Sequence, residues 1–514
     1  QAMRENPLAV RSAGILLHPT SLPGAPALGG LGPEAREFVD FLQAAGQTFW
    51  QMLPIHPVGA GDSPYDSPSA FAGATHLISL EELASWGLLS LREVHALPAD
   101  ADPGHADFDR ARRERPPLLQ RAFATFREHA PAELTRAYDE FLSRNNSWVW
   151  DYALFTALKG EAEQRPWPTW SPELRHREPG ALEAAHHRLH DAIHYEVFLQ
   201  FCFQHQWDAL HHYARERGVR LMGDIPMFVA HDSVDVWANQ RLFFLDAEGA
   251  RTVQAGVPPD YFSEDGQLWG NPIYRWDTMR EEGYGWWIDR LRRELMKFDA
   301  VRLDHFIAFA RYWEVPIDAV SAKTGRYVPG PSYDFLERAG RDLEGLPLLA
   351  EDLGIVTREV ELLRDHFALP GMKVLQFAFA PGAEGYLPHR HAANTVVYTG
   401  THDNNTTRGW YDDLVARAET SPEVRTELER VRAFTGVTSA DDIAWSLIRS
   451  LLASPSHTAI VPVQDILGLD EGYRMNVPGL AQGNWTYRLL PGQLNPQLAE
   501  RLHALAQVTE RTAR

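Results

Sequence analysis

The chain has 514 residues, 44% of them hydrophobic and 23% charged, a composition that is typical of a folded globular protein and excludes wholesale disorder. A formal net charge of -20 argues against nucleic acid and against anionic membranes as partners. The single cysteine, Cys202, excludes an internal disulfide and any cysteine-based metal cluster.

At the N-terminus, no apolar signal-peptide core precedes the first predicted strand, at residues 13–17. No later apolar run reaches the roughly 18 residues that a membrane span needs, so we expect a cytoplasmic protein. A helix is predicted over 33–45, with Pro33 at its start and Gly46 after its end, and a second strand over 48–55. Residues 59–73 have no periodicity and are rich in Ser, Tyr and Asp, which fits either hydroxyl recognition or ordinary turn chemistry.

Helical periodicity dominates from about residue 79 to 217. Four helices are predicted, over 117–129, 132–144, 151–163 and 189–217, while the polar stretch 97–117 predicts a connection. A third strand, over 219–228, contains Asp224 and is followed by an irregular segment, 230–286, that is rich in Gly, Pro, Trp and Tyr. Loops of this length usually act as lids or binding loops.

The rest of the chain alternates between strands and helices. A helix over 289–298 leads into a fourth strand within 298–306, and strands follow at 346–351, 372–379, 395–399 and 458–463, with helices at 357–366, 443–453 and 495–506. Eight strand candidates, mostly continuous apolar runs, predict an α/β fold, a closed parallel (β/α)8 TIM barrel buried on both faces. We expect one catalytic domain over 1–514, with insertions at 60–217 (helical), 229–290 (lid) and 307–345, and no separate C-terminal β-domain.

Acidic side chains follow three of the predicted strands. Asp304 ends the fourth strand, Glu351 ends the fifth, and Asp403 comes just after the seventh. Because the carboxyl ends of barrel strands share one rim, we expect the three acids to converge there. Arg302 shares a strand face with Asp304, so its guanidinium would keep that carboxylate ionised and oriented; for this segment alone, a structural ion pair is the alternative.

Three converging carboxylates suit the cleavage of a glycosidic bond. Repulsion and partial burial would push their pKa values apart, so that one stays ionised while another holds a proton near neutrality. Glu351 can then protonate the leaving oxygen while Asp304 attacks the anomeric carbon, with about 5–5.5 Å expected between the two carboxyl groups. Asp403 would hold sugar hydroxyls and stabilise positive charge, and His402 would donate to a neighbouring hydroxyl.

A divalent metal site is the competing use of three carboxylates at a barrel rim. Arg302 would compete electrostatically with such an ion, and the tryptophans and tyrosines of the loops suit stacking against sugar faces. These residues therefore favour carbohydrate chemistry over a metal-dependent enzyme, whose activity a chelator would remove.

Motifs along almost the whole chain share one family resemblance. Four of them surround the charged residues: Gly223-Asp224-Ile225-Pro226, Arg302-Leu303-Asp304-His305-Phe306, Ala350-Glu351-Asp352-Leu353-Gly354 and Thr401-His402-Asp403-Asn404. Others lie at 14–24, 62–65, 69–73, 258–276, 474–479 and 483–485. Together these segments resemble the amylomaltases, the 4-α-glucanotransferases or disproportionating enzymes of the α-amylase clan.

This resemblance implies a role for individual residues. It implies Asp304 as nucleophile, Glu351 as acid/base and Asp403 as transition-state stabiliser, in agreement with the roles argued above. It implies no metal and no organic cofactor. The substrate-binding residues that it implies are Ser63, Tyr65, Asp224, Gln267, Trp269, Arg302, His305, His402 and Asn476.

The resemblance also implies transfer between glucans, with cyclisation as a further outcome. A sugar acceptor held under a closed lid outcompetes water for the glycosyl-enzyme intermediate, and the Trp269 and Tyr65 loops are the expected acceptor walls. The expected partners are glucose and α-1,4-glucans (maltooligosaccharides, amylose and glycogen-type chains), with the protein a monomer or weak homo-oligomer. A hydrolytic α-amylase and a non-catalytic glycan-binding module remain rivals, which products and turnover would separate.

Overall fold

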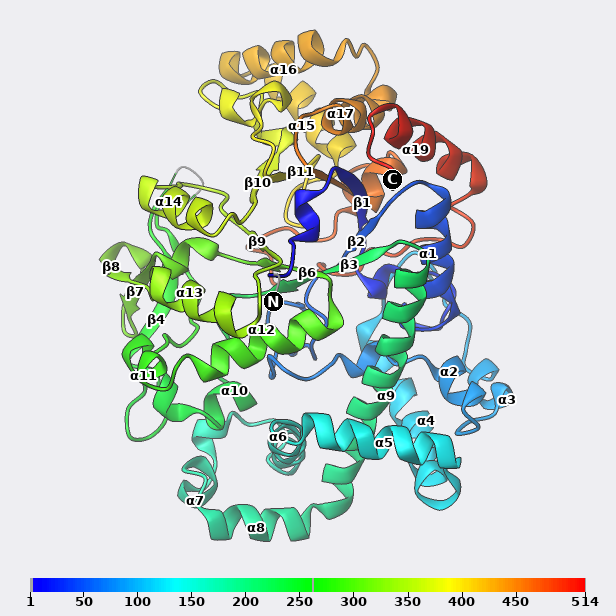
Figure 1. The fold of residues 1–514 in the computed structure, drawn as a ribbon, viewed down its shortest axis with the longest axis vertical. Coiled ribbons are helices and arrows are strands. Elements are labelled where there is room, and N and C mark those ends of the chain that lie inside the picture. Colours follow the sequence, from blue (N-terminus) through cyan, green and yellow to red (C-terminus); the bar gives the residue numbers. More distant parts are fainter. Residues whose placement is uncertain (1–2, 261–262, 514) are drawn as a thin grey trace.

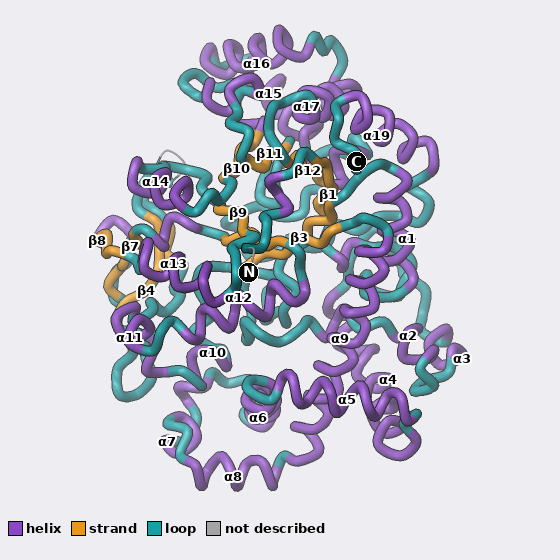
Figure 2. Tube along the Cα trace, viewed as in Figure 1, coloured by secondary structure: helices purple, strands orange, loops and turns teal. Residues whose placement is uncertain are grey.

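A sheet of eight parallel strands forms the centre of the computed structural model, which describes residues 3–260 and 263–513 (Figures 1 and 2). The sheet order is β10-β11-β12-β1-β2-β3-β6-β9. Each strand overlaps a segment predicted as one, so the predicted (β/α)8 fold is confirmed. The strands are β1 (Ser12–Leu16), β2 (Phe49–Gln51), β3 (Arg220–Ile225), β6 (Ala300–Leu303), β9 (Leu348–Ala350), β10 (Gly371–Val374), β11 (Thr395–Tyr398) and β12 (Thr458–Pro462).

Continuous burial explains why these short apolar runs become strands. Every residue of β1, β6, β11 and β12 is buried, as in a parallel sheet covered on both faces. The close approach of β1 and β2 requires a glycine, because a Cβ on Gly14 would lie 2.5 Å from the Cβ of Phe49. Helices surround the sheet, beginning with α1 (Pro33–Ala44) between the first two strands.

A backbone hydrogen bond and the contacts of one buried carboxylate, not a strand ladder, join β9 to β10. The N–H of Ala350 donates to the carbonyl of Pro370 (2.9 Å). The buried carboxylate of Asp352 accepts from the N–H of Met372 (2.9 Å) and from the guanidinium of Arg364 (2.6 Å). We call this junction the seam; together its contacts nearly close the barrel.

Eight helices lie between β2 and β3, and the last of them returns to the barrel wall (Figure 1). The predicted connection over 97–117 is wrong in part, because a helix begins at Phe108 and continues through Pro116 and Pro117. The Asp107 carboxylate caps the first turn of this helix by accepting from the N–H of Arg110 (3.0 Å). Burial of one face of the helix offsets the loss of the two hydrogen bonds that the prolines cannot donate. The eight helices are α2 (Leu80–Ser85), α3 (Leu91–His95), α4 (Phe108–His129), α5 (Ala132–Asn145), α6 (Val149–Glu161), α7 (Pro172–Arg175), α8 (Pro179–Arg188) and α9 (His190–Glu216).

A small antiparallel sheet joins the segments that follow β3 and β6. Its order is β5-β4-β7-β8, so the stretch predicted as irregular contains two of its strands. The elements after β3 are α10 (Val234–Trp237), β4 (Val253–Val257), β5 (Gln267–Leu268), α11 (Trp276–Glu281) and α12 (Gly285–Lys297); those after β6 are β7 (Arg311–Pro316), β8 (Arg326–Pro329) and α13 (Ser332–Asp342). Two residues of the predicted lid motif, 261 and 262, lie outside the described residues.

Helices α14 (Arg358–His366), α15 (Thr407–Ala418), α16 (Pro422–Thr435), α17 (Ile443–Leu452), α18 (Val463–Ile466) and α19 (Pro496–Val508) complete the chain. Near its end, the buried guanidinium of Arg511 donates to the carbonyls of four residues: Ser12 (2.9 Å), Leu452 (2.6 Å), Ser454 (3.0 Å) and His457 (2.9 Å). In the described part of the chain, no helix combines the length and the apolar character that crossing a membrane requires.

Candidate active site

Neighbouring strands place charged side chains side by side at one end of the barrel. In the ladder between β3 and β6, Asp224 lies opposite Arg302, and β9 is the other neighbour of β6. Asp304 directly follows β6, and Glu351 directly follows β9. The register of the sheet therefore brings these four residues to the carboxyl ends of adjacent strands, where barrel enzymes carry their chemistry.

The buried guanidinium of Arg302 holds two of the acids. Its Nη1 donates to both carboxylate oxygens of Asp224 (3.0 and 2.9 Å), and its Nη2 lies 3.1 Å from Oδ1 of Asp304. Burial alone would lower the pKa of Arg302, but the charges of Asp224 and Asp304 raise it well above its usual range. Burial raises the pKa of Asp224 to about 7, against the opposing effect of Arg302. Arg302 therefore fixes the orientation of Asp304, as the spacing of the two residues predicts.

Glu351 lies directly beside the residue that follows Asp304. Its carboxylate accepts from the N–H of His305 (2.9 Å) and from the N–H of Leu353 (2.8 Å). Burial, together with the nearby charge of Asp304, raises the pKa of Glu351 to about 7. Glu351 is only 9% exposed, whereas the Asp304 side chain is 31% exposed. The two acids thus differ in environment, Glu351 being almost buried and Asp304 partly exposed.

His305 connects this pair to the lid. Its φ of 56° is in the left-handed region, which non-glycine residues adopt at an energetic cost and which recurs at functional sites. Burial lowers the pKa of His305 to about 4, so the ring is neutral near pH 7. Trp269 meets this ring edge-on at 4.7 Å, and the Trp269 indole N–H donates to Oε1 of Gln267 (3.1 Å). Both predicted lid residues therefore belong to one contact group beside His305.

Asp403 is held from the opposite side by the C-terminal segment. The amide of Asn476 donates to Oδ1 of Asp403 (2.7 Å), and Nε2 of His402 lies 3.3 Å from the same oxygen. The guanidinium of Arg474 donates to the backbone carbonyls of Asp403 (2.7 Å) and Asn476 (2.8 Å). Asp403 itself stays open, with 46% of its side chain exposed.

Tyr65 links the two sides of the site. Its hydroxyl donates to Oδ2 of Asp224 (2.5 Å), and its ring stacks on the ring of His402 at 5.0 Å. Burial raises the pKa of Tyr65 well above its usual range, with added contributions from the charges of Asp224, Asp304 and Asp403. The hydroxyl of Ser63 accepts from the N–H of Tyr65 (3.2 Å) and shapes this turn. Tyr65 therefore lies near Asp224, Arg302, Asp304 and Asp403.

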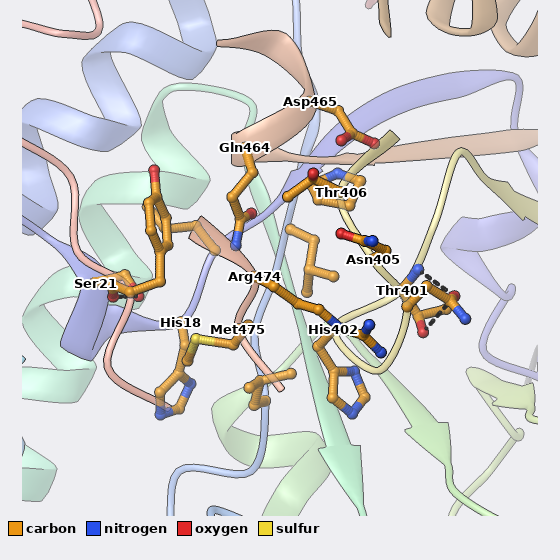
Figure 3. A pocket seen from close by; sticks show the side chains of 16 residues that line it. His18, Ser21, Thr401, His402, Asn405, Thr406, Gln464, Asp465, Arg474 and Met475 are labelled. Carbon is orange, nitrogen blue, oxygen red and sulfur yellow. Dashed lines mark hydrogen bonds between the residues drawn. The ribbon is translucent and has the colours of Figure 1, made fainter. Parts of the chain in front are cut away.

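The loop that carries His402 and Asp403 is anchored by buried polar side chains. Asp465, in α18, accepts from the Thr399 hydroxyl (2.6 Å), the Thr407 N–H (2.8 Å) and the Thr407 hydroxyl (2.7 Å). Gln376 donates to the carbonyl of Asn405 (3.0 Å). Behind the loop lies a cavity of about 30 Å³, large enough for about two water molecules; Figure 3 shows the side chains that line it.

Sequence reasoning missed two residues that support the site, Asp465 and Arg474. Asp465 follows the eighth predicted strand, so an acid at a strand end was a usable signal. Arg474 lies within a matched motif, but its contact with Asp403 spans 71 positions and has no local signature. Within residues 3–260 and 263–513, no three His, Cys, Asp or Glu side chains are arranged to hold a metal ion.

A family model and two similar proteins all carry the same description, 4-alpha-glucanotransferase. Residues 17–493 match the model of the glycoside hydrolase 77 family, which is described as 4-alpha-glucanotransferase. The sequence is 46% identical over 506 residues to the 4-alpha-glucanotransferase of Thermus thermophilus, covering 98% of this chain and 99% of that protein. It is 44% identical over 502 residues to the 4-alpha-glucanotransferase of Synechocystis sp., covering 97% of each.

A solved structure is similar over the same length. The amylomaltase of Streptococcus agalactiae, determined in complex with acarbose, superposes with a TM-score of 0.92 at 35% sequence identity. The match covers 98% of this chain and 100% of that chain.

Proposed function

The chain belongs to the 4-alpha-glucanotransferase family and is a 4-alpha-glucanotransferase, and from this premise we propose a retaining double displacement for its reaction. It moves α-1,4-glucan segments from a donor to the 4-hydroxyl of an acceptor glucan or of glucose. One observation carries the proposal: Glu351 accepts a hydrogen bond from the N–H of His305, the residue directly after Asp304 (2.9 Å). Glu351 and the Arg302-bound Asp304 thus lie at the carboxyl ends of adjacent strands.

In the first half-reaction, Asp304 attacks the anomeric carbon of the donor while Glu351 gives its proton to the departing glycosidic oxygen. The bond from the carbon to Asp304 forms as the bond to the leaving oxygen breaks, which produces a covalent glucosyl ester and a free donor fragment. The pKa of Glu351, raised to about 7, supports its role as the acid. The ion pair of Asp304 with Arg302 (3.1 Å) supports its role as the nucleophile.

The second half-reaction reverses these roles. Ionised Glu351 takes the proton from the acceptor 4-hydroxyl, whose oxygen attacks the anomeric carbon and releases Asp304. Two inversions at one carbon give retention. Asp403, held by Asn476 and beside His402, would bind hydroxyls of the same ring and stabilise its positive charge in both transition states.

The lid decides between an acceptor sugar and water. Trp269 packs against His305, the residue that follows Asp304 and donates its N–H to Glu351. On the other wall of the proposed acceptor site, the Tyr65 hydroxyl donates to Asp224. A sugar stacked between these aromatic side chains reaches a high effective concentration at the glucosyl ester while it excludes water. We assign Ser63, Gln267 and the other predicted contacts to binding of the glucan.

Incubation with maltotriose as sole substrate tests the proposed reaction. A transferase produces glucose together with chains longer than maltotriose, because the segment cut from one chain is joined to another chain and the remainder is released. Products that are only shorter than maltotriose would identify a hydrolase instead. The measurement is the chain-length distribution of the products over time.

Two substitutions test the assigned roles. Asp304→Asn is expected to abolish transfer, and Glu351→Gln to lower it by about 10²–10⁴-fold, while both keep the wild-type circular dichroism spectrum. A donor with a fluoride leaving group needs no acid, so Glu351→Gln should accumulate an ester on Asp304 that mass spectrometry detects. Asp318→Asn, at an exposed position, is the matched control. Wild-type turnover by Asp304→Asn, or an ester on another residue, would contradict the assignment.

A further inference from the structure

A second cavity lies on the flank of the molecule, away from the active-site acids. It measures about 500 Å³, within the range of small-molecule pockets, and opens between α5, α9 and the C-terminal half of α12. The N-terminal segment adds Arg4 to its wall. In Figure 1, the N-terminus and α12 lie next to each other, above α5. None of the predicted site residues lines this cavity, which we call the flank cavity.

Cationic side chains outnumber acidic ones in the lining of the flank cavity. Five of them face two carboxylates, in a protein whose net charge is -20. The cations are Arg4, Arg144, Arg215, Arg293 and Lys297, and the acids are Glu140 and Asp208. Such a local excess of positive charge in an acidic protein raises the local concentration of anions.

Three of the five cations have carboxylate partners. Arg144 pairs with Glu140 (2.5 Å), Arg293 lies 3.3 Å from Asp289, and Arg215 lies 4.0 Å from Asp299. The Arg293 guanidinium also lies 6.0 Å from the ring centroids of Phe71 and Trp148. These pairs leave two cations of the lining, Arg4 and Lys297, to be explained.

Lys297 is the least compensated charge. Its side chain is buried, with the residue only 6% exposed, and its ammonium donates to the carbonyl of Phe71 at a long 3.4 Å. No carboxylate among the described residues lies within 4.0 Å of it or of the Arg4 guanidinium. The nearest acid along the helix, Glu294, is already held by His56 (2.8 Å). Burial lowers the pKa of Lys297, against the charges of Glu294 and Asp208. Because a buried ammonium without an ion-pair partner is costly, a bound anion would lower the free energy of this site.

We propose that the flank cavity binds a small phosphate-bearing molecule of the sugar phosphate class. Lys297, Arg4 and Arg215 would hold the phosphate, which offers several oxygens to guanidinium and ammonium donors. Trp148 and Phe71 line the same cavity and offer aromatic faces to a sugar ring, while Gln204 offers its amide oxygen to the hydroxyls. A volume of about 500 Å³ suits a small molecule.

Calorimetry with glucose 1-phosphate and orthophosphate at matched ionic strength tests the proposal. Glucose 1-phosphate is expected to bind saturably to one site per chain and more tightly than orthophosphate. Arg4→Ala should weaken this binding about tenfold, because it removes a charge-assisted contact at an exposed position. Arg92→Ala, also exposed but on α3, removes the same charge elsewhere and should leave the binding unchanged.

Lys297→Met gives an independent readout. It removes a buried charge while keeping the length of the side chain, so the unliganded protein should melt at a higher temperature while glucose 1-phosphate binds at least about tenfold more weakly. Binding that neither Arg4→Ala nor Lys297→Met alters would overturn the site. Displacement of glucose 1-phosphate by maltotriose in the Asp304→Asn variant would assign the binding to the catalytic cleft and overturn it too. Equal affinity for glucose 1-phosphate and for orthophosphate would show that the sugar contributes nothing and would reject the sugar phosphate class.

Discussion

At the scale of single residues, access to water separates the three acids. Glu351 is almost fully buried, Asp304 is partly open and paired with Arg302, and Asp403 is the most exposed. Burial raises the pKa of a carboxyl group, and a neighbouring guanidinium fixes the orientation of a carboxylate. These environments fit the proposed roles of acid for Glu351 and nucleophile for Asp304, although the side-chain chemistry of the three residues is nearly the same.

The pH profile of transfer should report the burial of Glu351. Its pKa is raised to about 7, and the first half-reaction needs the protonated form, so kcat/KM for the donor should fall about tenfold per pH unit above pH 7. The measurement is the initial rate at low maltotriose concentration between pH 5 and pH 9. A glucosyl fluoride donor, which needs no proton, should lack the alkaline fall. A flat maltotriose profile across this range would contradict the assignment of Glu351 as the acid.

Residues of the site could be predicted where the signal is local. Arg302 and Asp304 are two positions apart, so a strand brings them together, and the sequence is enough to predict their contact. The contact of Asn476 with Asp403 spans 73 positions and connects two loops. Only the family resemblance pointed to Asn476, because no periodicity or spacing relates two segments that meet solely through the fold.

At the scale of elements, buried strands were predictable and the lid sheet was not. The barrel strands are continuous apolar runs because both faces are covered. In the lid, β5 is exposed and β8 is mostly exposed, so neither carries an apolar pattern. Strands β4 and β7 pair although barrel strand β6 lies between them in the sequence, and no local sequence pattern predicts pairing between such distant segments.

The lid strand β5 gives a test of the choice between transfer and hydrolysis. Trp269→Ala should raise the ratio of hydrolysis to transfer, because it opens the acceptor side of the glucosyl ester to water. The ratio is measured as new reducing ends against chains longer than the substrate. Leu268→Ala, at the neighbouring exposed position, is the control and should leave the ratio unchanged. An unchanged ratio in Trp269→Ala would reject the role of the lid.

The loop after β11 depends on one buried carboxylate. Asp465→Asn would turn an amide N–H₂ toward hydroxyl and N–H groups that now donate to Asp465, and should cost about 1–3 kcal/mol of folding stability. Because the loop carries His402 and Asp403, kcat should fall as well. Urea unfolding and maltotriose kinetics measure the two effects. The exposed Asp412→Asn should change neither, and wild-type kinetics in Asp465→Asn would show that the loop holds its position without this anchor.

At the scale of the whole molecule, the chain ends are joined through the barrel wall. Arg511 reaches four backbone carbonyls: one in the first strand, one at the end of α17 and two between α17 and β12. Carbonyls that are buried or partly buried need a donor. One C-terminal side chain therefore connects segments that lie hundreds of positions apart.

Removing this guanidinium should destabilise the entire fold. Arg511→Met removes four hydrogen bonds, although Arg11 still donates to the carbonyls of Leu452 and Ser454 and the N–H of Ser12 still donates to that of His457, and we expect a loss of about 1–3 kcal/mol in the free energy of unfolding. Urea unfolding followed by circular dichroism measures the loss. Arg92→Met, on the surface, should stay within about 0.5 kcal/mol of wild type. A loss of similar size in both variants would mean that Arg511 contributes no more than surface charge.

The seam between β9 and β10 has a consequence for how the catalytic groups move. Asp304 and Glu351 belong to strands on one side of that junction, whereas Asp403 follows β11 on the other side. Local opening favours regions with few backbone hydrogen bonds, so thermal motion at the junction would move Asp304 and Glu351 together and Asp403 separately. If the proposed roles hold, warming would let Asp403 move away from the sugar ring while Asp304 and Glu351 keep their mutual distance, and stabilisation of the transition state would weaken before the proposed nucleophile and acid separate.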